Sequence, residues 1–170
     1  MRTAAVTTLM IAALLALAFS ALAAQAQPGE RLFEFERFTG NARPFIGGAE
    51  PIRGVNAGGL PWVIDKAEAR LSPDGLLEVE VDGLVIDPDD AAAQDARVAG
   101  TNPVPAFRAI LSCLTTAGVA APDNTLTAAA PATADGDARI VEQLDLPDTC
   151  IAPIVFVTSP AGAWFAASGF

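Results

Sequence analysis

The sequence predicts an all-β fold, namely a single-domain β-sandwich of about eight short, mostly antiparallel strands. Three observations support this prediction. Apolar and polar residues alternate in several short segments, clusters of Gly, Pro and Asp separate these segments, and only one short segment has a helical pattern. Because each sheet has an apolar face to bury, two sheets must pack together, and a small closed β-barrel is the alternative.

The first strand is predicted in residues 32–38, where Phe33 and Phe35 alternate with glutamates. This alternation places one face of the strand against a core and the other against water. Residues 40–61 are rich in Gly, Pro and Asn, which predicts a long loop.

The strongest local prediction is a β-hairpin formed by residues 62–71 and 76–86. A Ser-Pro-Asp-Gly turn lies between the two arms. Its proline presets φ, and Gly75 at its end accepts a positive φ. We therefore expect these arms to pair in antiparallel fashion, with one face of the hairpin exposed to solvent.

Residues 87–105 are acidic and irregular, and Asp90 is expected to cap a short helix over residues 91–98. Long connections of this kind are usually either functional or mobile, and the sequence does not show whether this one is ordered.

The remaining strands are predicted at residues 107–114, 125–129, 138–146, 154–158 and 163–170. The last two form a hairpin around a type I turn with proline at its second position and glycine at its fourth. Four large aromatic side chains are predicted to lie in the core, namely Trp62, Phe107, Phe156 and Trp164.

Residues 1–26 are predicted to be a secretory signal peptide, which leaves residues 27–170 as the mature domain. Arg2 precedes an apolar run that ends in small residues, and cleavage is expected after Ala26, with Ala23 as the alternative. An uncleaved membrane anchor is the alternative to cleavage. We therefore expect a secreted, extracytoplasmic protein without stable membrane insertion after cleavage.

The cysteines are Cys113 and Cys150, and an even pair in an exported chain predicts a disulfide. On the chain-entropy model, closing a loop of this length contributes about 3 to 4 kcal/mol. A reactive cysteine is the alternative, but the chain has no histidine to lower the pKa of a thiol.

The composition excludes much chemistry, because without histidine there is no Ser-His-Asp triad, no Cys-His dyad and no histidine-ligated zinc. The chain has 20 acidic and 10 basic residues, for a net charge of −10, and its basic residues are scattered. Binding to a nucleic-acid backbone is therefore not expected. No cofactor is predicted.

A candidate carboxylate face is formed by Glu78, Glu80 and Asp82, which alternate along one predicted strand. Neighbours on one strand face lie roughly 6.5 to 7 Å apart, near the separation of the carboxylates in an inverting glycoside hydrolase. The simpler interpretation is that these carboxylates form the solvated face of a half-buried strand.

A candidate calcium loop is formed by Asp87, Asp89 and Asp90, which could offer oxygen ligands. The segment lacks the spacing and the closing glutamate of an EF-hand loop, so turn formation is the favoured interpretation and no metal is predicted.

The preferred function is an exported, non-catalytic β-domain that acts by surface recognition, or as a structural component of the envelope, with an extracellular protein or glycan as its partner. One alternative is a carboxylate-dependent hydrolase of extracellular glycans. Another is a secreted protease inhibitor that presents residues 47–61 or residues 87–105. The sequence does not identify the ligand, the oligomeric state or the strand order.

Overall fold

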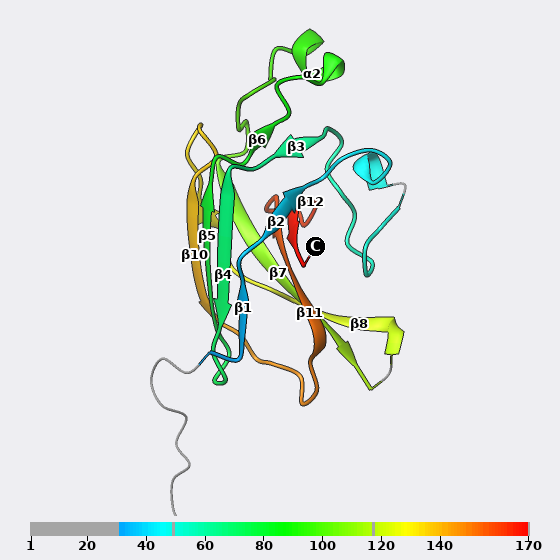
Figure 1. Cartoon of the computed structure of the whole chain (residues 1–170), viewed down its shortest axis with the longest axis vertical. Coiled ribbons are helices and arrows are strands. Elements are labelled where there is room, and N and C mark those ends of the chain that lie inside the picture. Colours follow the sequence, from blue (N-terminus) through cyan, green and yellow to red (C-terminus); the bar gives the residue numbers. More distant parts are fainter. Residues whose placement is uncertain (1–30, 49, 117, 170) are drawn as a thin grey trace, which may run out of the picture.

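The protein is an all-β sandwich in which two antiparallel sheets face each other (Figure 1). The computed structural model describes residues 31–48, 50–116 and 118–169, so the expected signal peptide lies outside the described residues. The first sheet consists, in order, of β1 (Phe33–Phe35), β4 (Lys66–Leu71), β5 (Leu76–Asp82) and β10 (Ala138–Gln143). The second sheet consists of β2 (Phe38–Gly40), β12 (Trp164–Ser168), β11 (Ile151–Thr158), β7 (Ala106–Thr115) and β8 (Gly118–Leu126).

The shorter elements lie around these sheets. They are β9 (Ala130–Pro131), which pairs with β7, a small sheet of β3 (Trp62–Val63) and β6 (Val85–Ile86), the 3-10 turn η1 (Ile46–Gly48) and the helix α2 (Ala91–Asp95). The described strands fall into separate sheets, so the fold is the predicted sandwich and not its barrel alternative. The strands outnumber the prediction because several predicted segments are split.

The main core lies between the two sheets, where strand alternation points apolar side chains inward. In β5, Leu77, Val79 and Val81 are buried while the residues between them are less buried or exposed. Phe107 and Leu111 of β7 meet them from the second sheet and are fully buried. All four aromatic side chains predicted to lie in the core are buried.

The predicted hairpin is confirmed, because β4 and β5 pair from Leu71 opposite Leu77 to Lys66 opposite Asp82. The amide of Gly75 donates to the Ser72 carbonyl at 3.0 Å, and Gly75 has the expected positive φ, 92°. The outer ends of the predicted arms leave this ladder and pair separately as β3 and β6.

The prediction of a single strand over residues 32–38 is wrong. The chain leaves the first sheet after Phe35 and enters the second sheet at Phe38. Its alternation is real, since Phe33, Phe35 and Phe38 all pack on the main core. The alternation does not reveal that the strand changes sheets, because both sheets bury the same kind of face.

The long loop predicted at residues 40–61 is irregular, but it is not a free surface loop. We call its described residues 41–48 and 50–59 the cover loop, because Ile52, Val55 and Ala57 of this segment pack on the outer face of the second sheet. Val55 and Ala57 join Ile110, Phe156 and Trp164 in a second core cluster there. The central strands of the second sheet are therefore buried on both faces, by the first sheet and by the cover loop, whereas Leu126 of β8 is exposed.

The predicted helix begins as expected, since the Asp90 side chain accepts a hydrogen bond from the Ala93 amide at 3.0 Å. The helix ends at Asp95, earlier than predicted, and Arg97 has a positive φ of 60°. Figure 1 shows α2 projecting beyond one end of the sandwich. Two backbone hydrogen bonds join the ends of this segment, which we call the α2 excursion. The Ile86 amide donates to the Thr101 carbonyl, and the Gly100 amide donates to the Ile86 carbonyl.

The C-terminal strands follow the prediction with one misplacement. The strands predicted from residues 107, 138, 154 and 163 correspond to β7, β10, β11 and β12. The strand expected at residues 125–129 is instead β8, Gly118–Leu126, so it begins earlier and ends earlier. Pairing with β7 selects a segment whose own residues have low strand propensity.

The structure contains the predicted disulfide between Cys113 and Cys150, whose Cα atoms are 4.7 Å apart. Cys113 is buried in β7, and Cys150 immediately precedes β11. These two strands are neighbours in the second sheet, and their register is irregular between Ile151 and Ile154. The bond therefore ties the irregular start of β11 to β7.

Candidate functional site

The candidate carboxylates Glu78, Glu80 and Asp82 lie on the solvent face of the first sheet. The register places a basic residue directly across from each of them: Arg70 opposite Glu78, Arg139 opposite Glu80 and Lys66 opposite Asp82. Opposite charges at facing positions stabilise an antiparallel pair. Glu68, in contrast, lies opposite Glu80, which is a pair of like charges. The face therefore combines three pairs of opposite charge with one pair of like charge, and we call it the charge ladder.

Ion pairs connect this ladder across the strands. The Arg139 guanidinium lies 3.2 Å from the Glu78 carboxylate and 3.5 Å from that of Glu80. The remaining pairs are Lys66 with Glu68 at 2.8 Å, Arg70 with Glu68 at 3.3 Å, Arg70 with Glu34 at 3.4 Å, and Arg31 with Glu34 at 2.7 Å. Glu34 and Glu68 thus belong to the same network as the predicted carboxylates.

The environment of this face favours charged side chains. A hydrogen bond from Lys66, and then its charge, hold the pKa of Glu68 below the ordinary value, and the same contact raises the pKa of Lys66. A general acid in glycoside hydrolysis usually needs an apolar setting that keeps its proton on near neutral pH. The Glu80 side chain, by contrast, is 53% exposed.

The three carboxylates of the candidate calcium loop are placed at turns. Asp87 accepts a hydrogen bond from the Asp89 amide at 2.9 Å, and Asp90 caps α2 and lies 3.3 Å from Arg43. Across residues 31–48, 50–116 and 118–169, no group of three or more acidic or cysteine side chains has the arrangement of a metal site.

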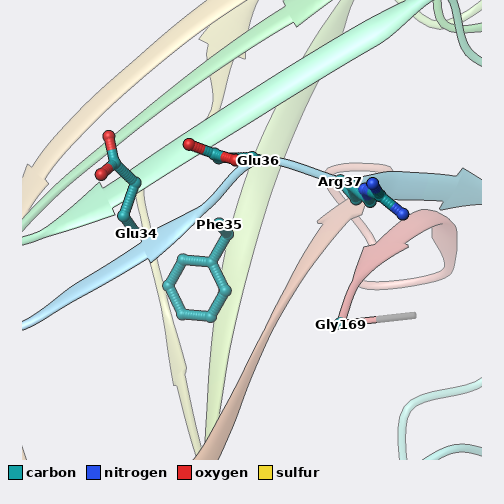
Figure 2. Close-up of a pocket in the computed structure, with 5 residues that line it drawn as sticks. All are labelled: Glu34, Phe35, Glu36, Arg37 and Gly169. Carbon is teal, nitrogen blue, oxygen red and sulfur yellow. The ribbon is translucent and has the colours of Figure 1, made fainter.

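A shallow hollow of about 340 Å³ lies where the chain crosses from β1 to β2. Figure 2 shows Glu34 and Glu36 pointing to one side of this segment and Phe35 to the other. Arg37 and Gly169 complete the lining. The hollow thus combines two carboxylates, one guanidinium and one partly buried aromatic ring.

A second hollow, of about 440 Å³, lies beside β5 and β10. Its lining brings the predicted Glu80 and Asp82 together with Asp137 and Arg139. The pairing of Ala138 with Val81 is what sets Asp137 beside Asp82. Asp137 also accepts a hydrogen bond from the Gly83 amide at 3.0 Å.

A third hollow, of about 360 Å³, has no charged side chain in its lining, and we call it the uncharged hollow. Its lining residues are Gly54, Val55, Asn56, Ile110, Asn124, Leu126, Ala161, Gly162 and Ala163. They come from the tip of the cover loop, from β7 and β8, and from the turn between β11 and β12. Sequence reasoning missed this hollow because its residues are far apart in the chain.

The tip of the cover loop is fixed against the second sheet. Arg53 and Gly54 form the turn between Ile52 and Val55, with φ values of 51° and 77°. The Arg53 guanidinium donates to the Ser112 carbonyl at 2.9 Å and to the Ala152 carbonyl at 2.6 Å. Partial burial lowers the pKa of Arg53. These hydrogen bonds hold the turn against the sheet, whereas α2 projects beyond one end of the sandwich (Figure 1).

Comparisons of the chain with protein-family models, with curated proteins and with solved structures found no significant match. The sheet arrangement and the Cys113–Cys150 bond define the class of protein as an all-β sandwich with one disulfide. Among the described residues, no helix has the length and apolar character needed to cross a membrane.

Proposed function

We propose that the chain is an exported recognition domain that binds an extracellular protein or glycan through its surface. The disulfide supports export, because such bonds persist in oxidising compartments. A signal peptide at residues 1–26 and a strongly acidic, soluble mature domain are parts of the same proposal.

The observation that carries this proposal is the uncharged hollow. The chain has a net charge of −10, yet this concave surface is lined by apolar side chains, glycines and the two amides of Asn56 and Asn124. Recognition sites are typically concave, with apolar side chains and a few polar groups that fix orientation. In this hollow, polar groups contribute about as much of the surface as apolar groups, and the Asn124 Nδ2 already donates to the Arg53 carbonyl at 2.9 Å. Leu126, at the margin of the hollow, is 45% exposed.

The ion pairs of the candidate carboxylates favour a recognition function over glycan hydrolysis. Glu78 and Glu80 share Arg139 in ion pairs on the exposed face of a sheet. Glycan hydrolysis is the second candidate function, because Glu80, Asp82 and Asp137 line one hollow. Its test is the loss of any activity in Glu80→Gln and Asp82→Asn variants.

The experiment uses purified, oxidised residues 27–170, labelled and incubated with the cell envelope of the producing organism and with a panel of extracellular glycans. Saturable binding without release of reducing ends is the expected result. Absence of binding to every sample would overturn the recognition proposal. Release of reducing ends that disappears in Glu80→Gln would instead establish the hydrolase.

A further inference from the structure

One of the two edge strands of the second sheet, β8, lies next to the uncharged hollow. β8 pairs with β7 on one side, and among the described residues no strand pairs with its other side. The Thr127 amide donates to the Ala109 carbonyl, so Thr127, Thr125 and Asp123 direct their backbone groups toward β7. The alternation of an antiparallel ladder then directs the N–H and C=O groups of Asn124 and Leu126 outward.

The length of this open edge is limited. Pro122 has no N–H to donate, and the pairing register with β7 is irregular beyond Asp123. Exposed edge strands are usually blocked by proline, charge or irregularity, because they otherwise pair with other chains. In β8 the edge is blocked only at Pro122 and before Asp123, so the outward backbone groups of Asn124 and Leu126 remain open to pairing.

The same two residues line the uncharged hollow. Across the second sheet, Phe156, Ile110 and Leu126 occupy facing positions in neighbouring strands. The cover loop buries Phe156 and Ile110 but leaves Leu126 exposed. The hollow is thus the uncovered end of an apolar row, and it opens beside unpaired backbone groups.

We propose that this edge binds an extended peptide segment of a partner protein, which adds a strand to β8 and places an uncharged side chain in the hollow. Backbone hydrogen bonds supply affinity in such strand addition, and a pocket for one side chain supplies specificity. This inference rests on the proposed recognition function and names its site and its class of partner.

Charge identifies the kind of segment. The hollow has no charged group to compensate a buried charge in the bound side chain, so that side chain is uncharged. The chain as a whole is acidic, so basic residues flanking the segment increase the association rate. A second copy of this chain carries the same negative charge and is a less suitable occupant for that reason.

The test compares Leu126→Pro with Leu126→Ala. Both variants remove the leucine side chain, but only the proline variant also removes the outward N–H, which β7 does not use. The probe is a displayed library of random 12-residue peptides selected against the oxidised wild-type protein.

Circular dichroism and thermal unfolding of both variants confirm that the sandwich is retained. If Leu126→Pro unfolds, the comparison of Asn124→Pro with Asn124→Ala takes its place.

We expect selected peptides to be uncharged at their centre and to bind Leu126→Pro at least tenfold more weakly than Leu126→Ala. Binding should also slow amide hydrogen exchange at Asn124 and Leu126. A library without binders, equal binding to the two variants, or protection elsewhere would overturn the inference. Wild-type dimerisation that is lost in Leu126→Pro would also overturn it, because the edge would then pair with a second copy.

The same variants separate this inference from the broader proposal. If Leu126→Pro binds the cell envelope as well as the wild-type protein does, the recognition function stands and the strand-addition site is wrong. If the wild-type protein does not bind the envelope, the recognition function itself fails.

Discussion

The Arg53 guanidinium, at the tip of the cover loop, donates a 2.6 Å hydrogen bond to the Ala152 carbonyl at the irregular start of β11. Its other terminal nitrogen donates to Ser112 in β7. One side chain thus attaches the cover loop to two adjacent strands. This attachment and the packing of Val55 and Ala57 keep Phe156 and Ile110 beneath the loop from water.

Arg53→Ala should destabilise the fold by about 2 kcal/mol, because hydrogen bonds that involve a charged donor contribute roughly 1.5 to 3 kcal/mol. Urea unfolding followed by tryptophan fluorescence measures the change. Arg37→Ala is the control, since Arg37 is exposed and the structure shows no ion pair of its side chain among the described residues; it should change stability by less than about 0.5 kcal/mol. Equal effects of the two variants would refute a clamping role for Arg53.

Asn41 provides a second attachment. This side chain is buried; its Nδ2 donates to the Trp164 carbonyl at 3.0 Å and its Oδ1 accepts from the Trp62 amide at 2.8 Å. Asn41→Ala should therefore cost about 2 kcal/mol, because it removes two buried hydrogen bonds that contribute roughly 1 kcal/mol each, while the Trp62 amide and the Trp164 carbonyl keep their backbone partners. Asn56→Ala is the matched control, because Asn56 is exposed and bonds Trp164 through its backbone. A loss of stability in Asn56→Ala as large as in Asn41→Ala would contradict this account.

The sequence contains the local part of this architecture. The hairpin of β4 and β5 was predictable because its alternation and its turn are both encoded within a few neighbouring residues, including Gly75. The charge ladder was predictable only as a solvated face, because the partners Arg70 and Arg139 are identified by strand register. The pair of Lys66 and Glu68 differs, because both residues lie on β4 and their spacing of two already places them on one face of the strand.

The cover loop and the uncharged hollow were not predictable, because they depend on contacts between distant segments. One signal was present in β12, where every residue from Trp164 to Ser168 is buried. A short strand without polar alternation is buried on both faces, so a second layer had to exist. The sequence does not indicate which segment supplies this layer, since Val55 and Ala57 lie in a Gly-rich stretch that resembles an ordinary loop.

The ion pairs of the first sheet should contribute a pH-dependent stabilisation. Because Lys66 lowers the pKa of Glu68 from the ordinary value of 4.5, this contribution is present above about pH 4.5 and is lost as the pH falls through the lower pKa of the folded state. Lys66→Gln should therefore be less stable than the wild type at pH 7, and the difference should disappear in acid. Urea unfolding from pH 2 to pH 7 measures it, with Arg37→Gln as a control that should show no such convergence. A difference that grows as the pH falls would exclude this origin.

Loss of the disulfide should reduce stability by about 3 to 4 kcal/mol, on the chain-entropy account of a loop of this length. Urea unfolding of the wild type with and without dithiothreitol measures this loss, since Cys113 and Cys150 are the only cysteines and form the only bond that the reductant can break. The paired Cys113→Ala and Cys150→Ala variant should reproduce it.

The disulfide and Arg53 should also be coupled. Ser112 is adjacent to Cys113, and Ala152 follows Cys150 by two residues, so the disulfide fixes the spacing of the two carbonyls that Arg53 binds. Contacts that share partners are not additive, so Arg53→Ala should cost less in the cysteine-free variant than in the wild type. Costs that agree within about 0.5 kcal/mol in the two backgrounds would mean that the cover loop is held independently of the disulfide.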